Sequence, residues 1–215
     1  MYTDGRSVIF IMPKCFCSIE KVMDLDNHVT SMSWLQGAIS SQEILAVAFA
    51  NGAFKLLSKG VRVERQVADA HSGAITCIKW SYEGTALATC GEDGQIKIWS
   101  KGGEIRSNLL QTSHPIYCVV WSPDNEAILF CSERSLSVMP QMPGTKQISW
   151  KAHDGIVLAA DWNPANNLIA SAGEDCKFRI WDAFGRQLFA SAPYDYVITS
   201  VAWSPSGELL AVGSF

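Results

Sequence analysis

Two sets of four side chains in this sequence combine an imidazole, a hydroxyl, a carboxylate and an indole at identical spacing. The first set is His71, Thr89, Asp93 and Trp99, and the second is His153, Ser171, Asp175 and Trp181. In both sets the successive separations along the chain are 18, 4 and 6 residues. A serine, a histidine and an aspartate are the groups of a hydrolytic triad, and they are also groups that can satisfy one another's hydrogen bonds in a protein interior.

The hydrolase interpretation makes Ser171 the nucleophile, His153 the base and Asp175 the orienting group. The same trio recurs in the first set, and the sequence contains no Gly-x-Ser-x-Gly elbow. Recurrence at equivalent places favours a structural role, in which losing one member leaves its neighbours unpaired at about 1–3 kcal/mol for each buried group. We therefore interpret both sets as structural tetrads and expect no catalytic residue and no enzyme activity.

Other chemistry has few candidate residues. Cys15 and Cys17 could supply two thiolates to zinc, but no second pair with short spacing lies near them. Cys176 falls in a turn, and nothing around it suggests an activated thiol. No glycine-rich phosphate loop opens a helix, so we expect no nucleotide, metal or other cofactor.

The elements that position the tetrads follow from a repeat of tryptophans. Trp80, Trp121, Trp162 and Trp203 are spaced 41 residues apart, and Trp34 lies 46 residues before Trp80. Each ends an alternating segment and is followed by a turn and an apolar run, which predicts two strands. A third strand is expected at residues 95–99 and 177–181, and a fourth at 104–109 and 186–190. Each repeat is therefore a unit of four antiparallel strands.

Four strands in each repeat of 41 residues, with Trp181-Asp182 closing one of them, are typical of WD repeats, whose units form the blades of a β-propeller. We expect an all-β, incomplete WD-repeat propeller with about four whole and two partial blades. The expected blade pieces are 1–25, 26–70, 71–112, 113–152, 153–194 and 195–215. Residues 2–12 are expected to lack the first two strands of their blade. Exposed sheet edges would then favour aggregation.

Small residues recur as regularly as the tryptophans. Three residues before the tryptophan stand Cys77, Cys118, Ala159 and Ser200, and ten residues after it stand Cys90, Cys131, Ala172 and Gly213. The cysteines are therefore expected to be small core residues. With seven cysteines and no secretory signal, a reducing compartment is expected.

Two blades depart from the tetrad pattern. Around Trp121, His114 is two residues off register, and Met139-Pro140 replaces Trp-Asp. Around Trp34, Asn51-Gly52 forms the turn, and Leu56-Leu57 ends the third strand. We expect both blades to rely on apolar packing and to be less rigid. Trp150, outside the tryptophan series, either packs between blades or belongs to a partner surface.

Composition excludes several classes of partner. The formal net charge is −4, and lysine and arginine form no block, so a nucleic-acid partner is not expected. The apolar stretch at residues 8–12 is too short for a signal peptide or a membrane span, and we expect a strand there and no membrane insertion.

Several stretches resemble the first propeller of one family, the eighty-kilodalton WD-repeat subunits of intraflagellar transport complex B. The similarity is carried by residues 82–87, 91–101, 150–156, 171–177, 198–203 and 211–215. It runs from about Glu43 onward, and Gly173-Glu174-Asp175-Cys176-Lys177 and Trp150-Lys151-Ala152-His153 are its most specific parts.

The resemblance implies a scaffold that binds other complex B proteins, supports intraciliary transport and cilium assembly, and resides in the cilium or flagellum, the basal body and the cytoplasm. Family members also carry a second propeller and a helical-repeat tail, which we do not expect within this sequence. The alternatives are another WD scaffold, such as a ubiquitin-ligase substrate adaptor or a coatomer-like subunit, and a propeller hydrolase.

Overall fold

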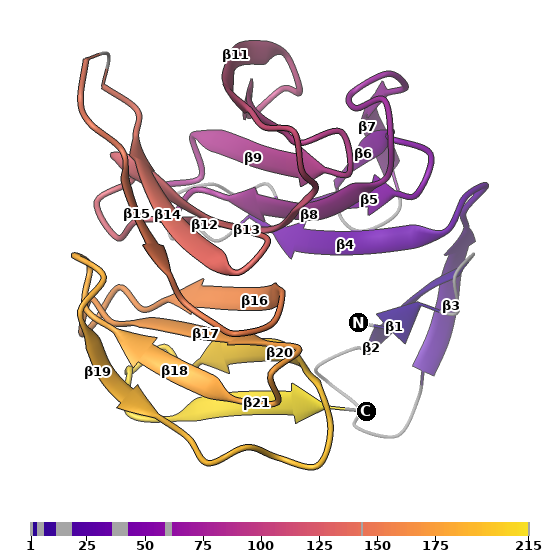
Figure 1. The fold of residues 1–215 in the computed structure, drawn as a ribbon. Helices are drawn as coiled ribbons and strands as arrows, with labels where there is room; N and C mark the ends of the chain where they lie inside the picture. Colours follow the sequence, from indigo (N-terminus) through magenta and orange to yellow (C-terminus); the bar gives the residue numbers. More distant parts are fainter. Residues whose placement is uncertain are drawn as a thin grey trace.

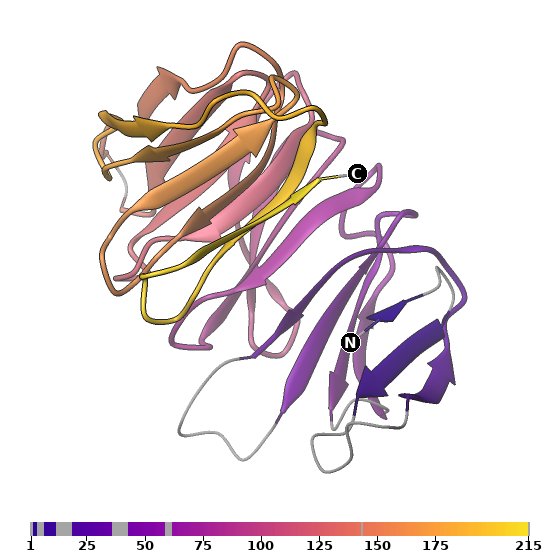
Figure 2. The ribbon, with the colours of Figure 1, turned by 90° about the horizontal axis from the view of Figure 1, so that it is seen from below.

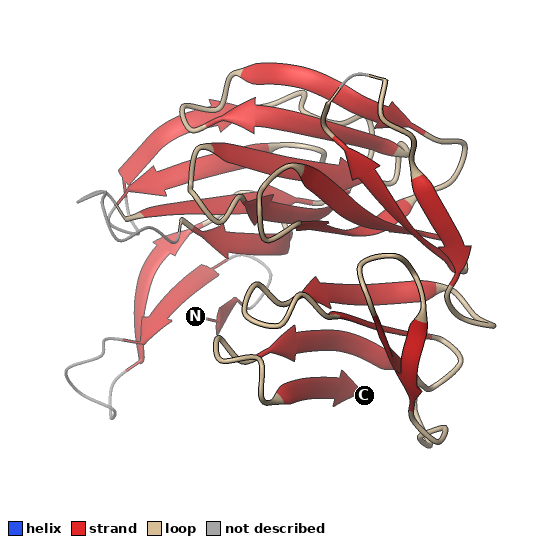
Figure 3. Ribbon diagram, turned by 90° about the vertical axis from the view of Figure 1, so that its left-hand side faces the viewer, coloured by secondary structure: helices blue, strands red, loops and turns tan. Residues whose placement is uncertain are grey.

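The computed structural model describes residues 2–3, 7–11, 19–35, 43–58, 62–142 and 144–214, with only the backbone for those before Met23. Every regular element in these ranges is a strand (Figure 3). No helix able to cross a membrane was found among the described residues.

The strands of these described ranges form six antiparallel sheets. The first contains β1 (Tyr2–Thr3), β2 (Ser7–Ile11) and β3 (Ile19–Asp24), and the second contains β4 (Val29–Trp34), β5 (Ile44–Phe49), β6 (Phe54–Ser58) and β7 (Arg62–Val67). The third contains β8 (Ile75–Trp80), β9 (Ala86–Gly91), β10 (Gln95–Ser100) and β11 (Ile105–Gln111). The fourth contains β12 (Ile116–Trp121), β13 (Ala127–Ser132), β14 (Ser135–Pro140) and β15 (Ile148–Lys151). The fifth contains β16 (Val157–Trp162), β17 (Ile169–Gly173), β18 (Phe178–Trp181) and β19 (Gln187–Ala190), and the sixth contains β20 (Ile198–Trp203) and β21 (Leu210–Ser214).

From the second sheet to the sixth, the first strand of each sheet lies against the first strand of the next. β8 contacts β4 on one side and β12 on the other, and β16 contacts β12 and β20. The outer strands β7, β11 and β19 are largely exposed, whereas β5, β9 and β17 are buried along their whole length. The sheets are therefore arranged like blades around a common axis, in an open ring (Figures 1 and 2). This confirms the all-β, incomplete propeller predicted from the sequence.

The regularly spaced tryptophans occupy equivalent positions in five sheets. Trp34, Trp80, Trp121, Trp162 and Trp203 each occupy the last position of the first strand of a sheet. In the third sheet Trp80 is the cross-strand partner of Leu87, and Leu87 is in turn the partner of Trp99. The fifth sheet repeats this register with Ile169 between Trp162 and Trp181. The regular spacing of the tryptophans in the sequence therefore reflects a repeated sheet with the same strand register.

A β-bulge recurs at the same place in five first strands. In each sheet the register shifts just before the residue that lies three positions ahead of the tryptophan. That residue is always small, and so is its partner on the second strand: the pairs are Ser31 with Ala48, Cys77 with Cys90, Cys118 with Cys131, Ala159 with Ala172, and Ser200 with Gly213. The four cysteines are buried, as expected for small core residues. Small side chains allow neighbouring blades to approach closely at this point.

The first sheet differs from the sequence expectation in one respect. Residues 2–12 were expected to lack two strands, but Tyr2–Thr3 forms β1 and pairs with β2. A short second strand is therefore present. The predicted strand at residues 8–12 is confirmed as β2, Ser7–Ile11.

Candidate functional site

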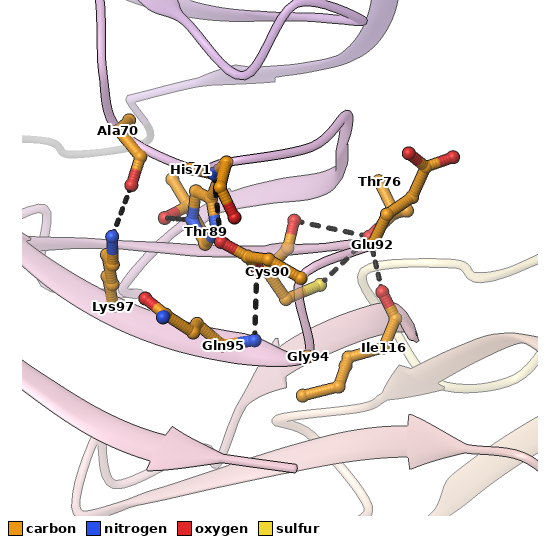
Figure 4. A network of polar contacts seen from close by, with 12 residues as sticks. Ala70, His71, Thr76, Thr89, Cys90, Glu92, Gly94, Gln95, Lys97 and Ile116 are labelled. Carbon is orange, nitrogen blue, oxygen red and sulfur yellow. Dashed lines mark hydrogen bonds and ion pairs between the residues drawn. The ribbon is translucent and has the colours of Figure 1, made fainter. Parts of the chain in front are cut away.

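The first tetrad joins a loop, two strands and the turn between them. His71 lies in the loop between β7 and β8, Thr89 on β9, Asp93 in the β9–β10 turn, and Trp99 near the end of β10. His71 Nδ1 is 2.9 Å from Asp93 Oδ1, His71 Nε2 is 2.7 Å from Thr89 Oγ1, and Trp99 Nε1 donates to Thr89 Oγ1 at 2.8 Å. Figure 4 shows the imidazole of His71 over Thr89. The four side chains form one chain in the order Asp, His, Thr, Trp.

The second tetrad repeats this geometry. His153 Nδ1 is 2.8 Å from Asp175 Oδ1, His153 Nε2 is 2.7 Å from Ser171 Oγ, and Trp181 Nε1 donates to Ser171 Oγ at 2.8 Å. The two tetrads lie in the third and fifth sheets, with the fourth sheet between them. The structure therefore brings together all eight residues singled out in the sequence, in two groups of four.

Proton positions follow from the direction of these bonds. Each hydroxyl accepts from an indole N–H, so its own proton is free to be donated to the histidine Nε2. Nδ1 then carries the remaining imidazole proton and donates it to the aspartate. The imidazole is neutral in this arrangement, and burial lowers the pKa of both His71 and His153.

The two aspartates are also shaped by their surroundings. Burial acts to raise the pKa of Asp93, but hydrogen bonds from His71 and from the backbone amides of Gln95 and Ser72 outweigh it, and the pKa is lowered. Asp175 follows the same pattern with His153. Each carboxylate therefore stays ionised and ties the loop before the first strand to the turn before the third.

Two residues that the sequence analysis did not single out complete these connections. Lys97 Nζ donates to the carbonyl oxygen of Ala70 (Figure 4), and Arg179 donates to the carbonyl oxygen of Ala152. Arg179 also contacts Asp175 Oδ2 at 3.0 Å. The sequence did contain a signal for these two residues, because a basic residue stands four positions after the tetrad aspartate in both repeats. Each cation ties the third strand to the loop that carries the histidine.

The fourth sheet has lost its tetrad. Phe130 occupies the position of Thr89 and is buried, and Met139 occupies the position of Trp99. The backbone position of His71 is taken by Thr112, whose N–H donates to the carbonyl of Gly94 as that of His71 donates to Gly52. His114 is exposed and lies 3.7 Å from Glu133. The off-register histidine therefore takes no part in the interior.

The second sheet replaces the tetrad with an apolar cluster. Leu25 stands nine residues before Trp34, at the position of the tetrad histidine. Val47 lies on the second strand, at the position of the hydroxyl residue, and Leu57 lies near the end of the third strand, at the position of the tetrad tryptophan. All three are buried in one cluster. Val47 pairs with Lys55 as Thr89 pairs with Lys97. The expectation that this blade relies on apolar packing is confirmed by that cluster.

Burial limits the chemistry open to the tetrads. Thr89 and Ser171 have no exposed surface, and the side chains of His71 and His153 have none either. Both hydroxyls also accept a hydrogen bond from an indole, which occupies a lone pair that a nucleophile would use. A substrate therefore has no path to Ser171 Oγ in this arrangement.

A separate cavity of about 330 Å³ lies where the first strands end. The five blade tryptophans contribute to its lining together with Lys79 and Asp161. Asp161 Oδ2 accepts the backbone N–H of Trp203 at 2.7 Å, and Ser81 Oγ accepts the N–H groups of its own turn. The described residues that line it include no histidine, so the cavity offers no serine–histidine pair for hydrolysis.

Trp150 packs between blades. Its ring centroid is 5.9 Å from that of Trp181 on the next sheet. A Cβ atom built on Gly185 would lie 2.7 Å from the Trp150 ring, so only glycine fits beneath the indole. Of the two alternatives given by the sequence, packing between blades is the one confirmed.

The structure describes only some of the cysteines considered in the sequence analysis. Cys15 and Cys17 lie outside the described residues. Among the residues that are described, no group of three or more His, Cys, Asp or Glu side chains could hold a metal ion. Cys176 is half-buried in the β17–β18 turn with φ of 59°.

Comparison with known proteins gives one family and two kinds of relative. The model of the WD domain, G-beta repeat family matches residues 63–100, 107–138, 144–182 and 187–215. The chain is 53% identical over 113 residues to the Intraflagellar transport protein 80 homologs of Mus musculus and of Rattus norvegicus. These residues are 53% of this chain and 14% of each relative, so the chain spans a small part of their length. It is also 39% identical over 80 residues to a guanine nucleotide-binding protein subunit beta of Solanum tuberosum, covering 35% of this chain and 20% of that protein.

The family match covers most of the chain and includes the fourth sheet, which has lost its tetrad. It agrees with the repeated register, the indole positions and the hydrogen-bonded tetrads of the third and fifth sheets. The chain therefore belongs to the WD domain, G-beta repeat family.

Proposed function

We propose that this chain is part of a non-enzymatic scaffold subunit of intraflagellar transport complex B, which supports intraciliary transport and cilium assembly through protein–protein contacts. The observation that carries the proposal is the 53% identity over 113 residues to proteins named as intraflagellar transport protein 80 homologs. The match to G-protein beta subunits is shorter and weaker, as expected when the repeat itself is the shared feature.

The geometry supports a scaffold over an enzyme. In each tetrad the hydroxyl and the imidazole bond to other members of the tetrad, and neither the residue with the hydroxyl nor the histidine side chain has exposed surface. In this proposal the tetrads stabilise two blades, and the loops and outer strands offer the variable residues that select partners. The partners are other complex B proteins, and the sites of action are the cilium or flagellum, the basal body and the cytoplasm.

Affinity purification of the full-length protein from ciliated cells tests the assignment. The proposal expects complex B subunits to be recovered in stoichiometric amounts, and the tagged protein to be found along the cilium. Recovery of ubiquitin-ligase subunits or vesicle-coat proteins in their place would overturn the ciliary assignment and favour one of the other WD scaffolds.

A further inference from the structure

Two blades place pairs of cysteines where the others place smaller side chains. Cys77 on β8 is the cross-strand partner of Cys90 on β9, and Cys118 on β12 is the partner of Cys131 on β13. The equivalent pairs in the other sheets contain serine, alanine or glycine. Packing at this position therefore needs a small residue and does not need a thiol, which leaves the paired thiols unexplained by packing.

The backbone geometry of these pairs suits a disulfide. Cross-strand partners in an antiparallel sheet have Cα atoms about 4.5–5.5 Å apart, inside the range of about 4.4–6.8 Å that a disulfide spans. The bulge before Cys77 adds Thr76, whose hydroxyl contacts Cys90 Sγ at 3.3 Å and also bonds to the carbonyls of Cys90 and Ile116 (Figure 4). The Cys77 thiol points toward the neighbouring blade, 3.6 Å from the carbonyl oxygen of Val119.

Charge distinguishes the first cysteine pair from the second. Lys79 stands two residues after Cys77, so both side chains project from one face of β8. At the equivalent place in the second pair stands Val120, which carries no charge. Hydrogen bonds from the thiols of Cys118 and Cys90, with the charge of Lys79, hold the pKa of Cys77 well below its usual range despite burial. Burial is the largest of the influences that raise the pKa of Cys90.

We propose that Cys77 is a site of reversible oxidation and forms a disulfide with Cys90, across β8 and β9, when the protein meets a hydroperoxide. The cross-strand register of Cys77 and Cys90, with Lys79 two residues after Cys77 on the same face of β8, carries the inference. The Cys77 thiolate attacks one peroxide oxygen; the O–O bond breaks, and hydroxide leaves and takes up a proton as water. The product is a sulfenic acid on Cys77. The Cys90 sulfur then attacks Cys77 Sγ, the S–O bond breaks, and a second water leaves with the Cys90 proton.

The inner position of β8 limits which oxidants can react. Cys77 is only 6% exposed, whereas Lys79 on the same strand lines the cavity at the strand ends. A molecule as small as hydrogen peroxide fits such an approach, and a bulky disulfide reagent does not. The reaction would fix the innermost strand to its neighbour without moving either one, because the two are already paired.

Timed oxidation of the full chain with hydrogen peroxide tests this proposal. After removal of the peroxide, free thiols are alkylated under denaturing conditions, the chain is cut at Glu83, between the two cysteines, and linked peptides are measured by mass spectrometry. The Cys77–Cys90 linkage should form several-fold faster than Cys118–Cys131 and should disappear after treatment with dithiothreitol. Equal rates for the two pairs, a Cys77–Cys118 linkage as the main product, or no linkage at all would overturn it.

Two variants separate chemistry from folding. Lys79→Val copies the residue of the neighbouring blade and should slow the Cys77–Cys90 reaction to the rate of the second pair. Cys90→Ala copies Ala172 and should leave Cys77 as a sulfenic acid that dimedone traps. Both should retain the melting curve of the parent chain. An unchanged rate in Lys79→Val would remove the electrostatic part of the argument, and unlabelled Cys77 in a folded Cys90→Ala variant would refute it.

Discussion

Replacing Thr89 with valine removes the centre of the first tetrad while keeping the shape of the side chain. The change deletes the bonds to His71 Nε2 (2.7 Å) and Trp99 Nε1 (2.8 Å) and leaves two buried polar groups without a partner. At about 1–3 kcal/mol for each, we expect a loss of about 2–6 kcal/mol in the free energy of unfolding. A domain stabilised by about 5–15 kcal/mol would lose a large part of its stability.

Thr89→Ser is the matched variant, because it keeps the hydroxyl and removes only a methyl group. We expect a loss of about 0.5–1.5 kcal/mol, typical of one buried methyl. Both variants are compared with the parent chain by equilibrium unfolding in urea, followed by tryptophan fluorescence and by circular dichroism. If valine proves as stable as serine at this position, the hydrogen bonds contribute little and the reasoning is refuted.

Three further outcomes are expected from the same structure. The buried imidazoles of both tetrads have lowered pKa values, so the unfolded chain binds more protons than the folded chain. The free energy of unfolding should therefore fall as pH drops below about 6.5. A melting temperature that stayed constant between pH 8 and pH 5 would contradict this. Gly185→Ala should destabilise the protein more than Gly144→Ala, because both glycines have positive φ but only the Cβ at Gly185 would meet the Trp150 ring; equal shifts in the unfolding midpoint would mean that this contact is unimportant. A double-mutant cycle with His71→Leu and Thr89→Val should give a coupling energy of about 0.5–3 kcal/mol, and strictly additive losses would mean that the two side chains do not interact.

The sequence predicts this fold well because the repeat supplies the same evidence several times. The third strand expected at residues 95–99 is confirmed as β10, Gln95–Ser100, and that at 177–181 as β18, Phe178–Trp181. The fourth strands at 104–109 and 186–190 are confirmed within two residues as β11 and β19. Alternation, turn residues and indole spacing all favour the same register, so errors at strand ends do not accumulate.

Details that depend on three-dimensional contacts were harder to predict. Spacing alone could not establish that the imidazole lies between the hydroxyl and the carboxylate, because it gives only separations along the chain. The part played by Lys97 and Arg179 depends on the path of the loop carrying the histidine, which a local pattern does not encode. Trp150 needed its partner Gly185, 35 residues later, before its packing role could be decided.

The central proposal is that Ser171 and Thr89 have the same structural role in two blades and are not catalytic residues. The most direct measurement compares the urea unfolding midpoints of Ser171→Ala and Thr89→Ala with that of the parent chain. Both midpoints should fall substantially, because each change leaves an imidazole nitrogen and an indole N–H unpaired in the interior. A Ser171→Ala protein as stable as the parent, beside a destabilised Thr89→Ala protein, would contradict that equivalence and reopen a chemical role for Ser171.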